Sequence, residues 1–164
     1  MIQSKTEQLQ IRVTFAEKAY IERAAKLAGL PMSQWVIKKL IRDNQQRFHQ
    51  IVDNIRPGKK ISYSLAVLND FLTGLLSVEF RDAVNEKPNM PNDSYLKNYI
   101  AAMIEFAAHK NKKDAPTWVY QIEPLKQPRF ASELSSFRLY LLTHSPPPFR
   151  KRNIFIDSSV GDQL

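Results

Sequence analysis

The sequence predicts a mainly α-helical protein that has one short strand near its N-terminus and two modules joined by a linker. Three observations support this prediction. Apolar and polar residues alternate strictly over residues 8–13 only, which is the spacing of a strand. Apolar residues then recur at helical spacing in most of the following stretches. Pro57 and Gly58, followed by two lysines, indicate a sharp turn or linker between two helical regions.

The short strand has an apolar face and a polar face. The apolar side chains are Leu9, Ile11 and Val13. The polar side chains are Gln8, Gln10 and Arg12. A single strand cannot bury an apolar face by itself, and an isolated two-stranded ribbon is only marginally stable in water. We therefore expect this strand to pair with another strand and to be covered by helices.

Two helices are predicted directly after the strand. Thr14 begins the pattern T-F-A-E, a capping box in which Thr14 and Glu17 satisfy each other's backbone amides. Gly29 ends this first helix where a left-handed cap is needed. After a short turn, Ser33 is a good N-cap for a second helix that reaches Phe48.

This order of strand, helix, turn and helix resembles the ribbon-helix-helix family, the Arc/MetJ type of DNA-binding protein, over about residues 7–48. In that family two chains pair their strands antiparallel, and four helices cover the inner face of the ribbon. The resemblance implies a homodimer whose core contains Leu9, Ile11 and Val13. Pro31 is a departure, because a small polar residue is more usual in the turn.

The resemblance also implies which residues contact double-stranded DNA, because the outer face of the ribbon enters the major groove. The implied base readers are Gln8, Gln10 and Arg12. Glutamine can bond to adenine through two hydrogen bonds, and arginine can do so to guanine. The implied phosphate contacts are Lys5, Ser33 and Gln34. Ser33 and Gln34 lie at a helix N-terminus, where free amides attract anions. The alternative is a solvated strand without a ligand.

The predicted module boundaries are residues 1–56 and 59–164. Helical patterns occur in residues 61–80 and 94–110, and a further helix should run from Ser132 to about Leu142 before the prolines of SPPP stop it. The chain then continues F-R-K-R-N-I-F-I. Apolar residues beside arginine suit the centre of an interface. The candidate partner-docking residues are Phe149, Arg152, Ile154 and Phe155. The alternative is a final strand or core segment with a charged lead-in.

The carboxyl half is similar to a module of bacterial regulators that are encoded beside nucleotidyltransferase-type toxins. The similarity involves Trp118 and residues 136–156, especially the stretch SPPPFRKRNIFI. It implies an antitoxin that represses its own operon through the first module and neutralises a cognate toxin through the second. The alternative is a plasmid or phage transcriptional regulator whose second domain serves oligomerisation.

Composition and charge narrow the classes of function. The net charge of +8 and the pI of about 9.7 favour an anionic partner. We expect no catalytic, metal or cofactor site, because the chain has no cysteine, no glycine-rich phosphate loop, and three histidines without metal-ligand spacing. We also expect a cytoplasmic protein without a membrane partner, since it lacks a signal-peptide core and an apolar run that could span a bilayer.

Overall fold

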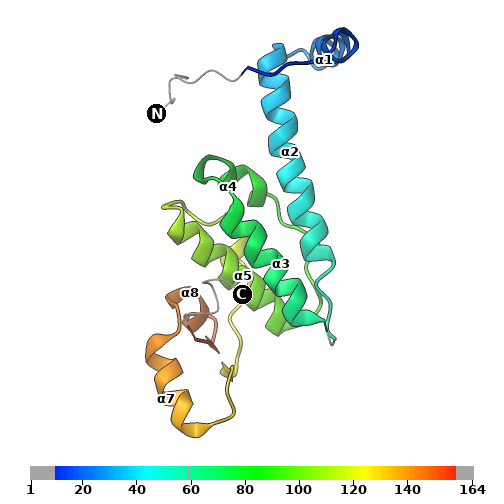
Figure 1. Cartoon of the computed structure of the whole chain (residues 1–164). Coiled ribbons are helices and arrows are strands. Elements are labelled where there is room, and N and C mark those ends of the chain that lie inside the picture. The colour runs from blue at the N-terminus through cyan, green and yellow to red at the C-terminus, as the bar shows by residue number, and fades with distance from the viewer. Residues whose placement is uncertain (1–9, 59, 158–164) are drawn as a thin grey trace. The chain divides into compact units, whose positions relative to one another are not determined.

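The structure, a computed structural model, describes residues 10–58 and 60–157 (Figure 1). The described part contains eight helices and one two-stranded sheet, so the prediction of a mainly helical protein is confirmed. No described helix has both the length and the apolar character to cross a membrane. The chain divides into two compact units, residues 1–40 and residues 41–164, and each is described by itself.

The first unit contains helix α1 (Phe15–Leu27) and the beginning of helix α2 (Met32–Asp53). The predicted capping box of α1 is confirmed: the Glu17 amide donates to Thr14 Oγ1 at 3.3 Å, and the Thr14 amide donates to Glu17 Oε2 at 2.8 Å. The Thr14 hydroxyl also donates to Glu17 Oε2 at 2.9 Å, and the bonds from the Thr14 amide and hydroxyl lower the pKa of the Glu17 carboxyl. Gly29 follows α1 with a φ of 65°, a left-handed conformation that favours glycine.

Helix α2 begins two residues before Gln34, the first helical residue that an N-cap at Ser33 would give. Its first residue is Met32, and the carbonyl oxygen of Pro31 accepts a hydrogen bond from the Trp35 amide at 2.9 Å. Ser33 therefore lies inside the first turn and is not the N-cap. The fixed φ of proline is compatible with the start of a helix, and this explains why the unusual Pro31 is tolerated in the turn.

The described residues of the predicted N-terminal strand, 10–13, form no strand in the single chain. Residues 10–14 have no regular secondary structure, and Leu9 lies outside the described residues. The hydrogen bonds of a ribbon connect two strands, so one chain alone cannot supply them.

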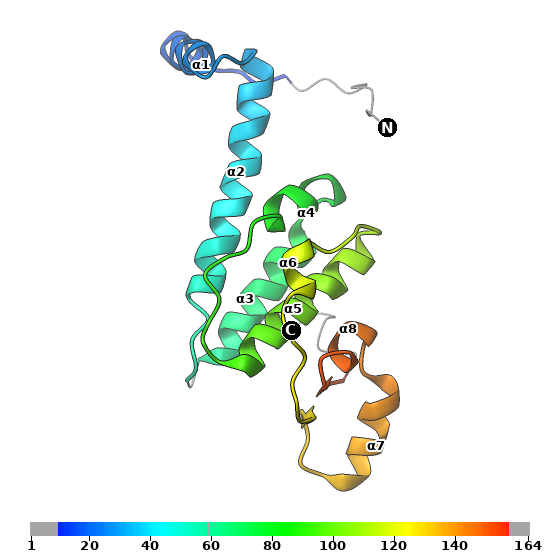
Figure 2. The ribbon, with the colours of Figure 1, turned by 180° about the vertical axis from the view of Figure 1, so that it is seen from behind.

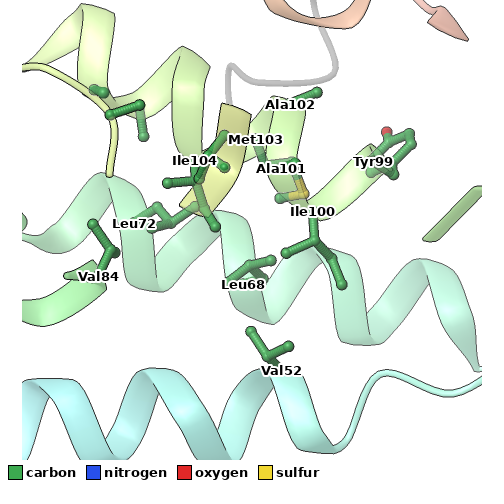
Figure 3. Packing of buried hydrophobic residues seen from close by; sticks show 14 of the residues in the cluster. Val52, Leu68, Leu72, Val84, Tyr99, Ile100, Ala101, Ala102, Met103 and Ile104 are labelled. Atoms are coloured by element: carbon green, nitrogen blue, oxygen red, sulfur yellow. The ribbon is translucent and has the colours of Figure 1, made fainter. Parts of the chain in front are cut away.

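The second unit is built around helix α5 (Ser94–Lys110), which is buried along most of its length (Figures 1 and 2). The helices packed with it are the second half of α2, α3 (Ile61–Gly74), α4 (Ser77–Val84), α6 (Thr117–Tyr120) and α8 (Pro147–Arg150). Figure 3 shows Leu68 and Leu72 of α3 facing Ile100 and Ile104 of α5, with Val52 of α2 beside Leu68.

Of two helices predicted for this unit, one agrees with the structure and the other is divided into two helices. The bounds of α5 agree with the predicted range 94–110, and its N-cap is Asp93, whose side chain accepts from the Leu96 amide at 2.8 Å. The range predicted as one helix, residues 61–80, forms α3 and α4 with a break after Gly74.

The carboxyl end of the second unit contains a small parallel sheet. Its elements are β1 (Arg129–Phe130), α7 (Ser135–His144), α8 (Pro147–Arg150) and β2 (Ile154–Phe155). Phe130 pairs with Phe155 across the two strands, and their rings stack at 4.8 Å. As predicted, the prolines of SPPP follow the end of α7, and they then open the short helix α8.

The boundary between the compact units lies before the predicted linker. Phe48, Val52 and Ile55 are fully buried and belong to the core of the second unit. The Phe48 ring stacks on Phe71 of α3 at 6.2 Å. The second half of α2 is therefore part of the second unit, although the sequence places it before Pro57 and Gly58.

Candidate nucleic-acid interface

The structure describes four of the six residues predicted to contact DNA. Lys5 and Gln8 lie outside the described residues. Gln10 and Arg12 precede α1, Ser33 and Gln34 lie in the first turn of α2, and all four are exposed. In an α-helix the amides of the first turn have no partner inside the helix. The described residues thus offer two groups of donors, one before α1 and one at the start of α2.

Ile11 and Val13, the two described residues of the predicted dimer core, are exposed in the single chain. Ile11 is 61% exposed and Val13 is 43% exposed. Val13 also lines a shallow hollow of about 450 Å³ together with Ala16, Tyr20, Ile21 and Glu17. The exposed part of each side chain contributes nothing to the stability of the single chain, because apolar surface is stabilising only when it leaves water.

The exposure of apolar side chains extends over the whole first unit. Ala25 is the only buried apolar side chain among its described residues. Further exposed apolar residues are Phe15, Tyr20, Leu27, Met32 and Ile37. The described residues of the first unit therefore do not form a hydrophobic core by themselves. Exposed apolar surface on this scale is typical of a unit that another molecule covers.

The first unit is also basic. Residues 1–40 contain seven Lys or Arg and three Glu. The cations in the described part are Arg12, Lys18, Arg23, Lys26, Lys38 and Lys39. Lys18 forms an exposed pair with Glu22 at 3.8 Å, and Lys39 lies over the Trp35 ring at 5.7 Å. An excess of cations beside exposed backbone amides favours a polyanion as ligand.

Residues 3–54 match the family model of NikA-like proteins, described as mobilization protein NikA. This family is of the ribbon-helix-helix type, so the resemblance inferred from the strand, the two helices and their caps is supported over these residues. The NikA-like segment includes the first unit and continues into α2, and the match does not extend to residues 55–164. No curated protein and no solved structure matches the chain significantly.

The residues predicted as a partner-docking surface lie downstream of the NikA-like segment, and the structure places them in the interior. Phe149, Arg152, Ile154 and Phe155 are all at most 9% exposed. The Phe149 ring packs edge-on against Tyr99 at 5.3 Å and against Phe106 at 6.5 Å. Burial raises the pKa of the Tyr99 phenol to about 12. These four side chains stabilise the chain's own core and do not form an accessible docking surface.

Arg152 has a structural environment that explains its burial. Its Nη2 atom donates to the carbonyl oxygen of Val119 at 2.9 Å and lies 3.6 Å from Glu105 Oε2. Its Nη1 atom donates to the carbonyl oxygen of Ile122 at 3.2 Å and to Asn98 Oδ1 at 3.3 Å. The alternative of a final core segment with a charged lead-in is therefore the one that the structure shows.

Sequence reasoning missed one exposed feature of the second unit, the surface of α7. Leu139 is 70% exposed and Leu134, just before the helix, is 69% exposed. The sequence contains a signal for this feature. A helix with one buried face has its apolar residues in a single stripe, whereas the apolar residues of this ten-residue helix occupy several sides.

Proposed function

We propose that this protein is a plasmid-associated ribbon-helix-helix protein that binds a specific site on double-stranded DNA as a homodimer and acts in plasmid mobilization or its regulation. The observation that carries the proposal is the match of residues 3–54 to the NikA-like mobilization family. The exposed apolar surface and the basic charge of the same residues support it.

Dimerisation follows from the missing core of the first unit. Ile11 and Val13 are exposed in one chain, and a second copy that pairs its own strand beside residues 9–13 would cover them. The same partner would fill the hollow beside Val13. Each chain then contributes a strand and two helices to one shared core.

Base reading is assigned to the opposite face of the paired strands. Successive side chains of a strand point to opposite faces, so Gln10 and Arg12 face outward when Ile11 and Val13 face the core. The major groove admits a two-stranded ribbon, and glutamine and arginine recognise adenine and guanine through two hydrogen bonds each. Gln8 continues the same face.

The start of α2 supplies the proposed phosphate contacts. Ser33 and Gln34 lie in its first turn, where backbone amides and the helix dipole favour an anion. Lys5 adds a charge at the N-terminal side of the strand. Such contacts fix the position of the dimer on DNA and contribute affinity that depends little on sequence.

The regulator and mobilization function is favoured over an antitoxin function. The matched family is named for mobilization, and the four residues that were expected to dock a toxin are buried in the chain's own core. Neither finding supports a toxin as partner.

The test is a binding experiment with a matched arginine control. Fragments of the plasmid that carries the gene are screened by gel shift and footprinting, and the protected site is then titrated by fluorescence anisotropy. Arg12→Ala should lose about 1–3 kcal/mol of binding free energy at the protected site and much less on random DNA. Arg23→Ala removes an equally exposed arginine of α1 and should keep the preference for the site.

Two results would contradict the proposal. The first is the absence of a protected site on any plasmid fragment. The second is a loss of affinity for Arg12→Ala that is equal on the protected site and on random DNA, because a base reader must contribute to discrimination.

A further inference from the structure

Helix α7 of the second unit presents apolar side chains to solvent on most of its surface. Leu141 is its one buried residue among Ser135–His144. The exposed apolar residues on and beside it are Leu134, Phe137, Leu139, Tyr140 and Leu142. Figures 1 and 2 both show α7 set apart from α3, α4 and α5 within this unit. A helix so placed has apolar surface that its own chain does not cover.

The contacts that hold α7 to its own chain are few. The Ser145 hydroxyl, just after the helix, lies 2.6 Å from the carbonyl oxygen of Leu141 and 2.7 Å from that of Ile156. Arg138 lies over the Phe130 ring at 5.4 Å. At its start, Leu134 provides no side-chain cap. Isolated helices of this length are marginal in water, so α7 depends on packing, and Leu141 is the one residue of the helix that its own chain buries.

The charge on α7 limits what that second surface can be. Arg138 is the only residue of α7 with a full charge at neutral pH, and its guanidinium already lies over Phe130. A nucleic acid or an acidic protein would be recognised through several cations, and α7 does not offer them. The face suits a partner surface that is itself apolar and nearly uncharged.

A second copy of the chain has such a surface. The chain carries a net charge of +8, so two copies repel each other wherever exposed lysines and arginines would meet. A twofold contact places the same patch on both sides, and an apolar, nearly neutral patch is complementary to itself. We propose that the α7 face, defined by Leu139, Tyr140 and Leu142, binds the α7 face of a second copy of this protein.

The local geometry fits a contact between two helices. Leu139 precedes the buried Leu141 by two residues, which places it on the opposite side of the helix. Its neighbours Ser135, Ser136 and Thr143 are small, so another helix can approach closely. Phe137, Tyr140 and His144 stack in a row beside this face, with ring distances of 5.3 Å and 4.0 Å, and the stack places Tyr140 at the edge of the face. Stacked aromatic rings lose little conformational freedom on binding, and aromatic residues are enriched among binding hot spots.

This contact is separate from the proposed ribbon dimer and gives it an additional property. The ribbon contact uses the first unit, and the α7 contact uses the second unit alone. A chain with two different self-association surfaces can link DNA-bound dimers to each other, which raises the local concentration at neighbouring sites. The inference rests on the proposed function only for this use of the contact.

The test isolates the α7 contact by removing the ribbon contact in the full-length chain. Ile11→Lys places a charge in the proposed ribbon core, and the variant should still form a dimer through α7 in sedimentation velocity experiments. Addition of Leu139→Glu should raise the dissociation constant of that dimer by about tenfold or more. The matched control is Leu76→Glu, because Leu76 is 64% exposed in the same unit and lies at the start of α4, outside the α7 face.

A second measurement does not depend on the ribbon variant. The natural chain has no cysteine, so Leu139→Cys introduces a single thiol. In a twofold α7 contact the two thiols lie near each other, and mild oxidation of the otherwise unchanged protein should give a covalent dimer on a denaturing gel. Leu76→Cys should remain a monomer on the same gel. Circular dichroism checks that each variant keeps its helix content.

The proposal is overturned if Ile11→Lys is monomeric at all concentrations, or if Leu139→Glu and Leu76→Glu affect the dimer equally. It is also overturned if Leu139→Cys does not cross-link. None of these measurements contains DNA. A failure of DNA binding therefore leaves the α7 contact standing, and a failure of the α7 contact leaves the DNA-binding proposal standing.

Discussion

At the scale of single residues, Arg152 is the most informative side chain of the second unit. It is 4% exposed, and it connects Glu105 and Asn98 of α5 with the backbone around α6. Burial lowers the pKa of the Arg152 guanidinium, and the nearby Glu105 carboxylate opposes that shift. Arginine still remains charged at neutral pH. Both ends of a buried ion pair are thus fixed by the fold of this unit.

Arg152→Met should lower the free energy of unfolding by about 3–5 kcal/mol, because it leaves the Glu105 carboxylate buried with Lys151 as its remaining charged partner. The double variant Arg152→Met with Glu105→Leu should regain much of that loss, since no buried charge is left uncompensated. Urea denaturation followed by circular dichroism measures both effects. Arg150→Met, at an exposed neighbour, is the control and should change little. Wild-type stability of Arg152→Met would contradict the structural role.

At the scale of elements, the sequence predicts best where the signal is local. The capping box at Thr14 and the bounds of α5 were predicted because caps and apolar spacing lie within a few residues of each other. The break after Gly74 was missed, because Leu75 and Leu76 continue the apolar pattern through it. The N-terminal strand needs hydrogen bonds from another chain, so the single chain leaves that prediction untested.

The burial of the carboxyl end was beyond such local reasoning. Phe149 packs against Tyr99 and Phe106, which are more than forty residues away in the sequence. Whether an apolar segment beside arginines faces solvent or core depends on these distant partners. The candidate DNA contacts stay a prediction, and they could be proposed from the sequence because the motif that implies them lies within the NikA-like segment.

Two glycines test how much backbone conformation contributes to stability: Gly29 lies in the turn between α1 and α2, and Gly74 ends α3. Gly29 has a φ of 65° and Gly74 does not have a positive φ, while an added Cβ would have no neighbour within 4 Å at either position. Gly29→Ala should therefore cost about 1 kcal/mol of stability from backbone strain. Gly74→Ala, at the last residue of α3, should be neutral or slightly stabilising. Thermal unfolding compares the two. Equal effects would mean that the backbone conformation at Gly29 does not limit stability.

At the scale of the whole molecule, the central feature is that α2 belongs to both compact units. The NikA-like segment ends at residue 54, within the part of the chain that contributes Phe48 and Val52 to the core of the second unit. Pro57 and Gly58 form a turn between α2 and α3, and α3 packs in the same core. A turn signal in the sequence marks the end of a helix here and not the end of a compact unit.

Two truncated chains distinguish a unit boundary inside α2 from a boundary at Pro57 and Gly58. Residues 41–164 contain the complete second core and should unfold cooperatively in urea. Residues 59–164 lack Phe48, Val52 and Ile55, each of which is fully buried, and should lose most of their stability, since removal of one large buried side chain already costs about 2–5 kcal/mol. Proton NMR spectra and urea titrations of both chains give the comparison. A well-folded 59–164 chain would place the boundary at the linker after all.

The shared helix has a consequence for how such proteins can exchange parts in evolution. A gene fusion or recombination event at the codons of Pro57 and Gly58 would transfer Phe48, Val52 and Ile55 away from the core that they fill. A productive exchange of first units must join the two genes inside the coding region of α2, upstream of Phe48, where both parents continue as helix. New binding specificities are therefore easier to acquire here by substitution at the surface of the first unit than by shuffling whole domains.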